Sequence, residues 1–124
     1  MQNQPVASDT GIVRPAVMSL AIRERAGLYA AYMPFLINGG IFIPTNKICH
    51  LGEEIFLLLS LMQDENRYPI AGRVAWITPA GASNNHSQGI GVQFSADDAG
   101  RKLRQRIEEL LGTALGSTRP THTL

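Results

Sequence analysis

Residues Tyr29–Thr45 read YAAYMPFLINGGIFIPT, and this stretch carries the clearest signal of how the chain folds. Its centre is a turn signal, Asn-Gly-Gly at 38–40, because asparagine and glycine tolerate the positive φ that tight hairpin turns require. Apolar residues lie on both sides of the turn, and Pro34 disfavours helical geometry at the residue before it. We therefore predict a hairpin whose strands span residues 35–37 and 41–45.

Four more segments have the composition and alternation of strands. They span residues 17–23, 55–62, 70–78 and 89–94, and turn-forming residues separate most of them. Residues 28–33 fit either a helical turn or a strand. Six short strands favour a small antiparallel barrel or sandwich.

A single long helix is predicted after the last strand. Ser95 is placed to cap it, and the acidic residues Asp97 and Asp98 suit the positive end of the helix dipole. Gly112 is placed to end it. Apolar residues recur between these ends at helical spacing and should cover an open end of the barrel: Leu103, Ile107, Leu110 and Leu111. The fold class is therefore mainly β, a six-stranded antiparallel β-barrel with a C-terminal α-helix.

The 124 residues fit one domain, which we place at 16–112 between an N-terminal tail (1–15) and a C-terminal tail (113–124). The net charge of +1 gives no basis for a polyanion-binding surface. The one cysteine, Cys49, cannot form an internal disulfide, and the first ten residues lack the pattern of a signal peptide. We expect a cytoplasmic protein without a membrane span or a nucleic-acid partner.

The chain offers little for catalysis or metal binding. His50, His86 and His122 have no carboxylate at ligand spacing, and Cys49 beside His50 points to the opposite side of an extended chain. Nucleophile and phosphate-loop motifs are absent from the sequence. We expect no enzyme activity, no catalytic residue, no cofactor and no metal.

The order of elements and several motifs resemble the PilZ domain family, in particular its member in type IV pilus biogenesis. The resemblance runs roughly from Met18 to Leu124. Its carriers are the segments 28–35, 39–45, 51–56, 71–79, 89–94 and 119–123. The resemblance implies a six-stranded barrel followed by a helix.

PilZ domains that bind cyclic di-GMP carry Arg-x-x-x-Arg near the N-terminus and Asp/Asn-x-Ser-x-x-Gly before a strand. This chain departs from both. Arg23-Glu24-Arg25 has another spacing, and with Gly40 as the motif glycine, Phe35 and Ile37 stand where the polar residues belong. Unpaired polar groups on the ligand would cost about 1–3 kcal/mol each. We predict no direct binding of cyclic di-GMP.

The resemblance then implies an adaptor for type IV pilus assembly and twitching motility. Its implied partners are the pilus extension ATPase (PilB-like) and an EAL-domain cyclic di-GMP receptor (FimX-like). Aromatic side chains dominate interface energies, and an extended tail can add to a partner's sheet. The candidate partner-binding residues are Tyr29, Tyr32, Phe35, Trp76, Pro120, Thr121 and His122.

Several alternatives stay open from the sequence. Phe35 and Trp76 fit the core as well as an interface, whereas Tyr29 and Tyr32 favour an exposed or half-exposed patch. The C-terminal tail is either ordered or disordered. The rival function is a module that binds cyclic di-GMP through Arg14, Arg23, Arg25 and the 38–40 turn.

Overall fold

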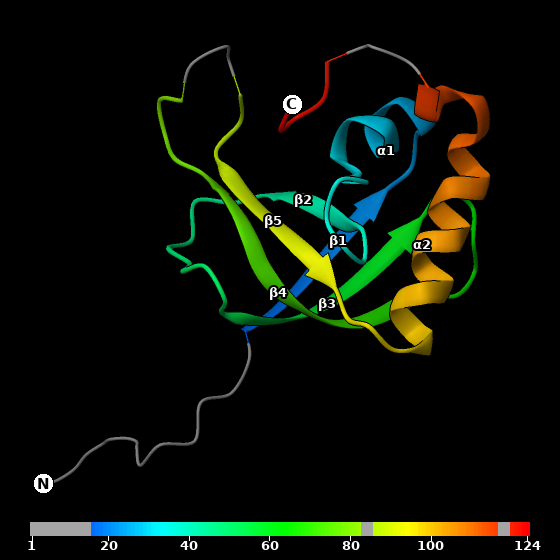
Figure 1. The fold of residues 1–124 in the computed structure, drawn as a ribbon, viewed down its shortest axis with the longest axis horizontal. Helices are drawn as coiled ribbons and strands as arrows, with labels where there is room; N and C mark the ends of the chain where they lie inside the picture. The colour runs from blue at the N-terminus through cyan, green and yellow to red at the C-terminus, as the bar shows by residue number, and fades with distance from the viewer. Residues whose placement is uncertain (1–15, 83–85, 117–119) are drawn as a thin grey trace, which may run out of the picture.

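The computed structural model describes residues 16–82, 86–116 and 120–124. Five strands form one curled sheet, with a short helix at one end and a long helix beside it (Figure 1). In chain order the elements are β1 (Ala16–Ile22), α1 (Arg25–Ala31), β2 (Gly40–Pro44), β3 (Glu54–Leu61), β4 (Tyr68–Thr78), β5 (Gly89–Phe94), α2 (Asp98–Leu111) and the 3-10 helix η2 (Gly112–Gly116).

The sheet is a half-barrel with the strand order β1-β3-β4-β5-β2. Three of its four strand pairs are antiparallel, but β1 and β3 run parallel. The expected six-stranded antiparallel barrel is thus corrected to five strands with one parallel pair. Parallel neighbours need a long crossover connection, and residues 23–53, which contain α1 and β2, supply it.

The predicted strand at 35–37 is wrong, and its place is taken by a series of turns. The chain leaves α1 at Tyr32, which forms an isolated bridge with Ile41, and Met33 N–H donates to Gly40 O at 2.9 Å. Residues 32–33 therefore form the first arm of the hairpin, and 34–39 are its loop. Gly39 has a φ of +75°, as expected for this turn.

The core follows the alternation read from the sequence. Met18 and Ile22 of β1 point inward and Val17 outward, and β3 alternates in the same way. The apolar stripe of α2 is fully buried at Leu103 and Ile107. Figure 1 shows α2 standing beside the sheet, where it contacts β4 and β5.

The ends of α2 are partly as predicted. Asp97, not Ser95, is the N-cap, and its Oδ1 accepts hydrogen bonds from Gly100 N at 2.9 Å and from Ser95 Oγ at 2.8 Å. Ser95 thus supports the cap from outside the helix, and both bonds hold the pKa of Asp97 below its ordinary value. The predicted end at Gly112 is confirmed, with a φ of +52°.

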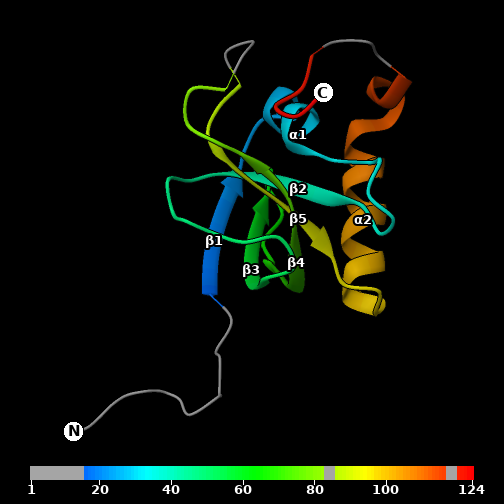
Figure 2. The ribbon, with the colours of Figure 1, turned by 60° about the vertical axis from the view of Figure 1, so that its left-hand side comes forward.

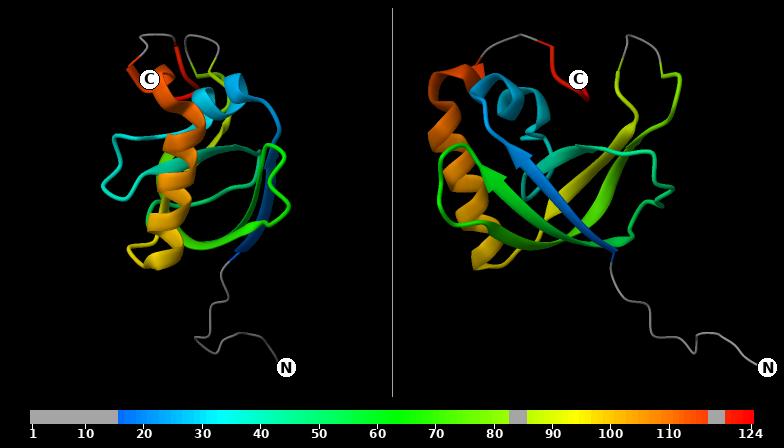
Figure 3. Two further views of the ribbon diagram at one scale, coloured as in Figure 1. Left: turned by 90° about the vertical axis from the view of Figure 1, so that its right-hand side faces the viewer. Right: turned by 180° about the vertical axis from the view of Figure 1, so that it is seen from behind.

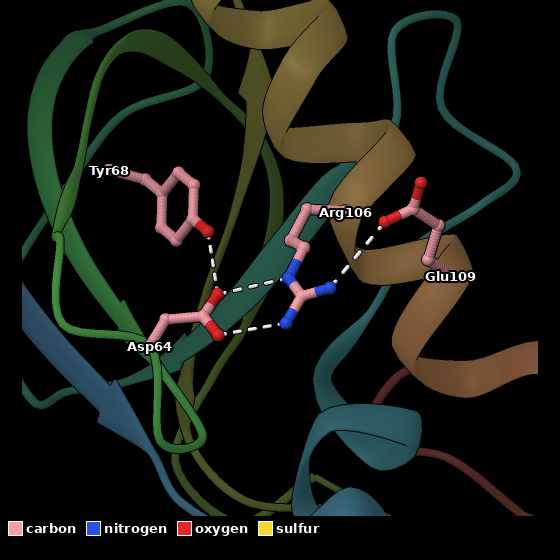
Figure 4. A network of polar contacts seen from close by, with 4 residues as sticks. All are labelled: Asp64, Tyr68, Arg106 and Glu109. Carbon is pink, nitrogen blue, oxygen red and sulfur yellow. Dashed lines mark hydrogen bonds and ion pairs between the residues drawn. The ribbon is translucent and has the colours of Figure 1, made fainter.

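An ion-pair network fastens α2 to the turn between β3 and β4 (Figure 4). Arg106 binds Asp64 with both arms of its guanidinium, through Nε–Oδ2 at 3.0 Å and NH2–Oδ1 at 2.8 Å. Tyr68 donates to Oδ2 of the same carboxylate at 2.6 Å. These donors favour the charged form, so the pKa of Asp64 lies below its ordinary value, Arg106 acting more strongly than Tyr68.

Candidate functional site

The loop at residues 34–39 is held rigidly against its neighbours. Arg104 of α2 donates from NH1 to Ile37 O at 3.0 Å, and Phe94 N–H of β5 donates to Gly39 O at 2.9 Å. Inside the loop, Gly39 N–H donates to Leu36 O at 2.9 Å. The loop projects beside α2 on the side of the molecule away from β1 (Figures 2 and 3). It therefore presents its side chains from a fixed backbone.

Two apolar side chains of this loop face solvent. Ile37 is 85% exposed and Phe35 44% exposed. The Phe35 ring meets Trp76 of β4 edge to face, with centroids 5.8 Å apart. The structure thus brings together two of the sequence-predicted residues. We name Phe35, Ile37 and Trp76 the loop patch.

Trp76 is half-buried, and its position depends on a glycine across the strand pair. Its indole Nε1–H donates to Thr78 Oγ1 at 2.8 Å, which fixes the ring. A Cβ at Gly91 would lie 2.8 Å from the Cβ of Trp76 and 2.5 Å from the sulfur of Met33. Gly91 therefore leaves the room that both side chains need.

Tyr32 does not belong to an exposed patch, which corrects that expectation. Its side chain is 2% exposed, and its hydroxyl donates to Glu108 Oε2 of α2 at 2.6 Å. Burial, and next the hydrogen bond to Glu108, raise the pKa of the phenol. The ring lies between the C-terminal end of α1 and helix α2, so Tyr32 is part of the hydrophobic core.

Tyr29 lies elsewhere, on α1. It is half-buried and lines a cavity of about 350 Å³ between α1 and η2, with Arg25 and Thr113 among the other lining residues. The half-exposed position expected for it is confirmed.

The described C-terminal residues fold back on the domain. His122 N–H donates to Ala30 O at 2.9 Å, and its imidazole stacks on Phe42 of β2 with centroids 5.1 Å apart. Thr121 Oγ1 accepts from Leu124 N at 3.0 Å, which closes a compact turn. Pro120 is exposed, whereas Thr121 and His122 are half-buried. Residues 120–124 are therefore ordered against α1 and β2.

Of the arginines in the rival hypothesis, the two that the structure describes, Arg23 and Arg25, do not line the groove that contains Asn38. Arg14 lies outside the described residues. Arg25 donates from NH2 to Leu111 O at 2.8 Å and so binds the end of α2, while Arg23 is exposed. Asn38 does line a groove of about 410 Å³. Among the described residues that line this groove, Arg73 is the one cation, and it is paired with Glu54 at 3.0 Å.

Within residues 16–82, 86–116 and 120–124, no group of three or more His, Cys, Asp or Glu side chains is placed to hold a metal ion. In the same part of the chain, no helix has the length and apolarity needed to cross a bilayer.

Sequence reasoning missed Ile37 as a surface residue, because an apolar run before a turn looks the same in a strand and in an exposed loop. It also missed the docking of His122 on Phe42, which joins residues far apart in the chain and leaves no local pattern.

The family model described as PilZ domain matches residues 14–112. No curated protein shows a significant match to the chain. The matched range contains the whole sheet and α2 but not the docked residues 120–124.

Proposed function

Because the chain belongs to the PilZ domain family, whose domains are generally non-enzymatic effectors or adaptors in cyclic di-GMP signalling, we propose that it is an adaptor that does not bind the nucleotide itself. It acts in the cytoplasm in type IV pilus assembly and twitching motility. Its partners are a pilus extension ATPase of the PilB type and an EAL-domain cyclic di-GMP receptor of the FimX type.

The observation that carries the proposal is the chemistry of the loop patch. Phe35 and Ile37, which stand at the positions of the polar motif residues, expose an aromatic ring and a branched alkane on a rigid loop. Neither side chain can pair with a guanine edge or a phosphate. An exposed aromatic anchor on a fixed backbone instead suits a protein partner, because it loses little conformational entropy on binding.

The second candidate function is direct binding of cyclic di-GMP. The groove beside Asn38 favours it, because Gln93 and Ser95 add polar groups and Phe56 adds an aromatic face. The Arg73–Glu54 pair weighs against it, since a phosphate would have to displace the Glu54 carboxylate from the guanidinium.

Binding measurements with matched variants test the proposal. Calorimetry of the chain with cyclic di-GMP should show no binding, and capture assays should detect the pilus ATPase or the EAL receptor. Ile37→Ser should weaken that capture by about 1–2 kcal/mol, or roughly tenfold. Ile48→Ser is the control, because Ile48 is 88% exposed but lies outside the loop patch.

Micromolar binding of cyclic di-GMP that Arg73→Ala abolishes would instead establish the second candidate, because Arg73 lines the groove beside Asn38. Equal losses for Ile37→Ser and Ile48→Ser would show that the loop patch is wrongly assigned. Tyr29→Ala and deletion of residues 120–124 test the two remaining groups of partner-binding candidates.

A further inference from the structure

The two edges of the half-barrel differ in how they are closed. At the β2 edge, Tyr32 bridges Ile41 and Met33 N–H bonds to Gly40 O. At the β1 edge, no segment among the described residues pairs with the side of β1 that faces away from β3. Figure 2 shows β1 at the margin of the sheet, next to β3.

The direction of the free backbone groups of β1 follows from one hydrogen bond. Met62 N–H, at the end of β3, donates to Ile22 O at 2.7 Å, so the carbonyl of Ile22 points toward β3. The backbone groups of a strand alternate in direction from one residue to the next. The N–H and C=O groups of Val17, Ser19 and Ala21 therefore point outward, to the open edge.

Nothing in β1 protects this edge from pairing. Edge strands usually carry a charge, a proline or a bulge that prevents association. Ala16–Ile22 reads AVMSLAI, without charge or proline, and its register against β3 is unbroken. Val17 is 67% exposed beside the edge. A cleft of about 270 Å³ at the end of β1 is lined by Leu20–Arg23 and by residues outside β1, among them Phe42, Pro44 and His122.

We propose that the open edge of β1 pairs with the same edge of a second copy of this chain, antiparallel and centred on Ser19. In that register Ser19 faces Ser19 of the second copy, and Val17 faces Ala21. All three residues point their backbone groups outward, so every facing pair exchanges two N–H···O bonds. The pairing joins two half-barrels into one continuous sheet.

A second copy of the chain fits this edge better than an unrelated strand, because two copies of β1 present the same small, uncharged residues to each other. The two-fold axis at Ser19 opposes only small, uncharged side chains, so no charge is left unpaired in the contact. Edge pairing buries less surface than a standard stable interface. The dimer is therefore weak and forms as the concentration rises.

Charge placed on the two-fold axis gives a sharp test. Analytical ultracentrifugation of the full chain should show a dimer that grows with concentration. Ser19→Lys alone and Ser19→Glu alone should each weaken it at least about tenfold, because like charges then face each other. An equimolar mixture of the two variants should restore the dimer. Ala71→Lys is the control, since Ala71 is exposed on β4 inside the sheet and should leave the dimer intact.

Cysteine cross-linking tests the register. Ser19→Cys should cross-link through a short bifunctional thiol reagent, whereas Val17→Cys should not, because four residues, or about 14 Å, separate the two copies of residue 17. The single native cysteine, Cys49, is buried. A chain that stays monomeric at every concentration overturns the proposal. So does a dimer that Ser19→Lys leaves unchanged, or equal cross-linking at positions 17 and 19.

Discussion

The Tyr32 hydroxyl donates a 2.6 Å hydrogen bond to the Glu108 carboxylate, which joins the C-terminal end of α1 to the last turns of α2. Arg104 Nε donates to the same carboxylate at 3.3 Å and binds the loop patch backbone at Ile37 O through NH1. Glu108 and Arg104 of α2 together thus link the end of α1 and the 34–39 loop to this helix. Through Glu108, Tyr32 is connected to Arg104 and so to the backbone of the loop patch. Its own buried side chain is not part of that patch.

Tyr32→Phe should lower the free energy of unfolding by about 0.5–1.5 kcal/mol, because it removes one hydrogen bond and keeps the buried ring. Capture of a partner should be unchanged. Urea denaturation and the capture assay check the two halves of this prediction. If the variant kept full stability but lost capture, Tyr32 would have to contact the partner directly.

The Asp64–Arg106 pair should make the domain sensitive to acid. The pKa of Asp64 is lowered in the fold, mainly by its bonds with Arg106. The stability from this shift is therefore fully present above the ordinary pKa of 3.8 and is lost as the pH falls through the lowered value. Asp64→Asn should cost about 1–3 kcal/mol at neutral pH and flatten the loss of stability on acidification.

Glu65→Gln is the matched control for this prediction, because Glu65 is exposed in the same turn. Thermal denaturation from neutral to acidic pH should show the parent and Glu65→Gln losing stability together, while Asp64→Asn changes less. Parallel curves for all three proteins would exclude Asp64 as the acid-sensitive group.

The strands and α2 could be predicted because their apolar residues follow the pattern of burial in the structure. Apolar residues alternate along β1 and β3, and in α2 they recur at helical spacing, as at Leu103 and Ile107. The strand at 35–37 could not be excluded, because an apolar run looks alike in a strand and in an exposed loop. The parallel pairing of β1 with β3 depends on contacts across residues 23–53, which no local pattern records. Tyr32 was misplaced for the same reason, since its partner Glu108 lies far along the chain.

Gly100→Ala should destabilise the protein although alanine favours helices. A Cβ at residue 100 would lie 1.9 Å from Ser95 O, a backbone atom that the Asp97 cap holds in place. Overpacking of this kind costs about 1–3 kcal/mol or more. Gly116→Ala is the control, because no atom lies within 4 Å of its added Cβ. Calorimetric melting should separate the two variants, and equal melting temperatures would contradict the reported contact.

Docking of the C-terminal residues should weaken as the pH falls. Burial against Phe42, and next the electrostatic effect of His86, lower the pKa of His122 below the ordinary value of 6.5. The neutral imidazole is thus favoured when docked, so the docked state is most stable above that value and loses stability as the pH falls toward the lowered pKa.

Amide hydrogen exchange at His122 reports this docking directly, because its N–H is bonded to Ala30 O. Exchange, corrected for the intrinsic effect of pH, should speed up on acidification in the parent and be fast at both pH values in Phe42→Ala, which removes the stacking partner. His122→Phe keeps an aromatic ring but cannot take up a proton, so it should stay protected across the same range. Loss of protection in His122→Phe on acidification would assign the effect to another group.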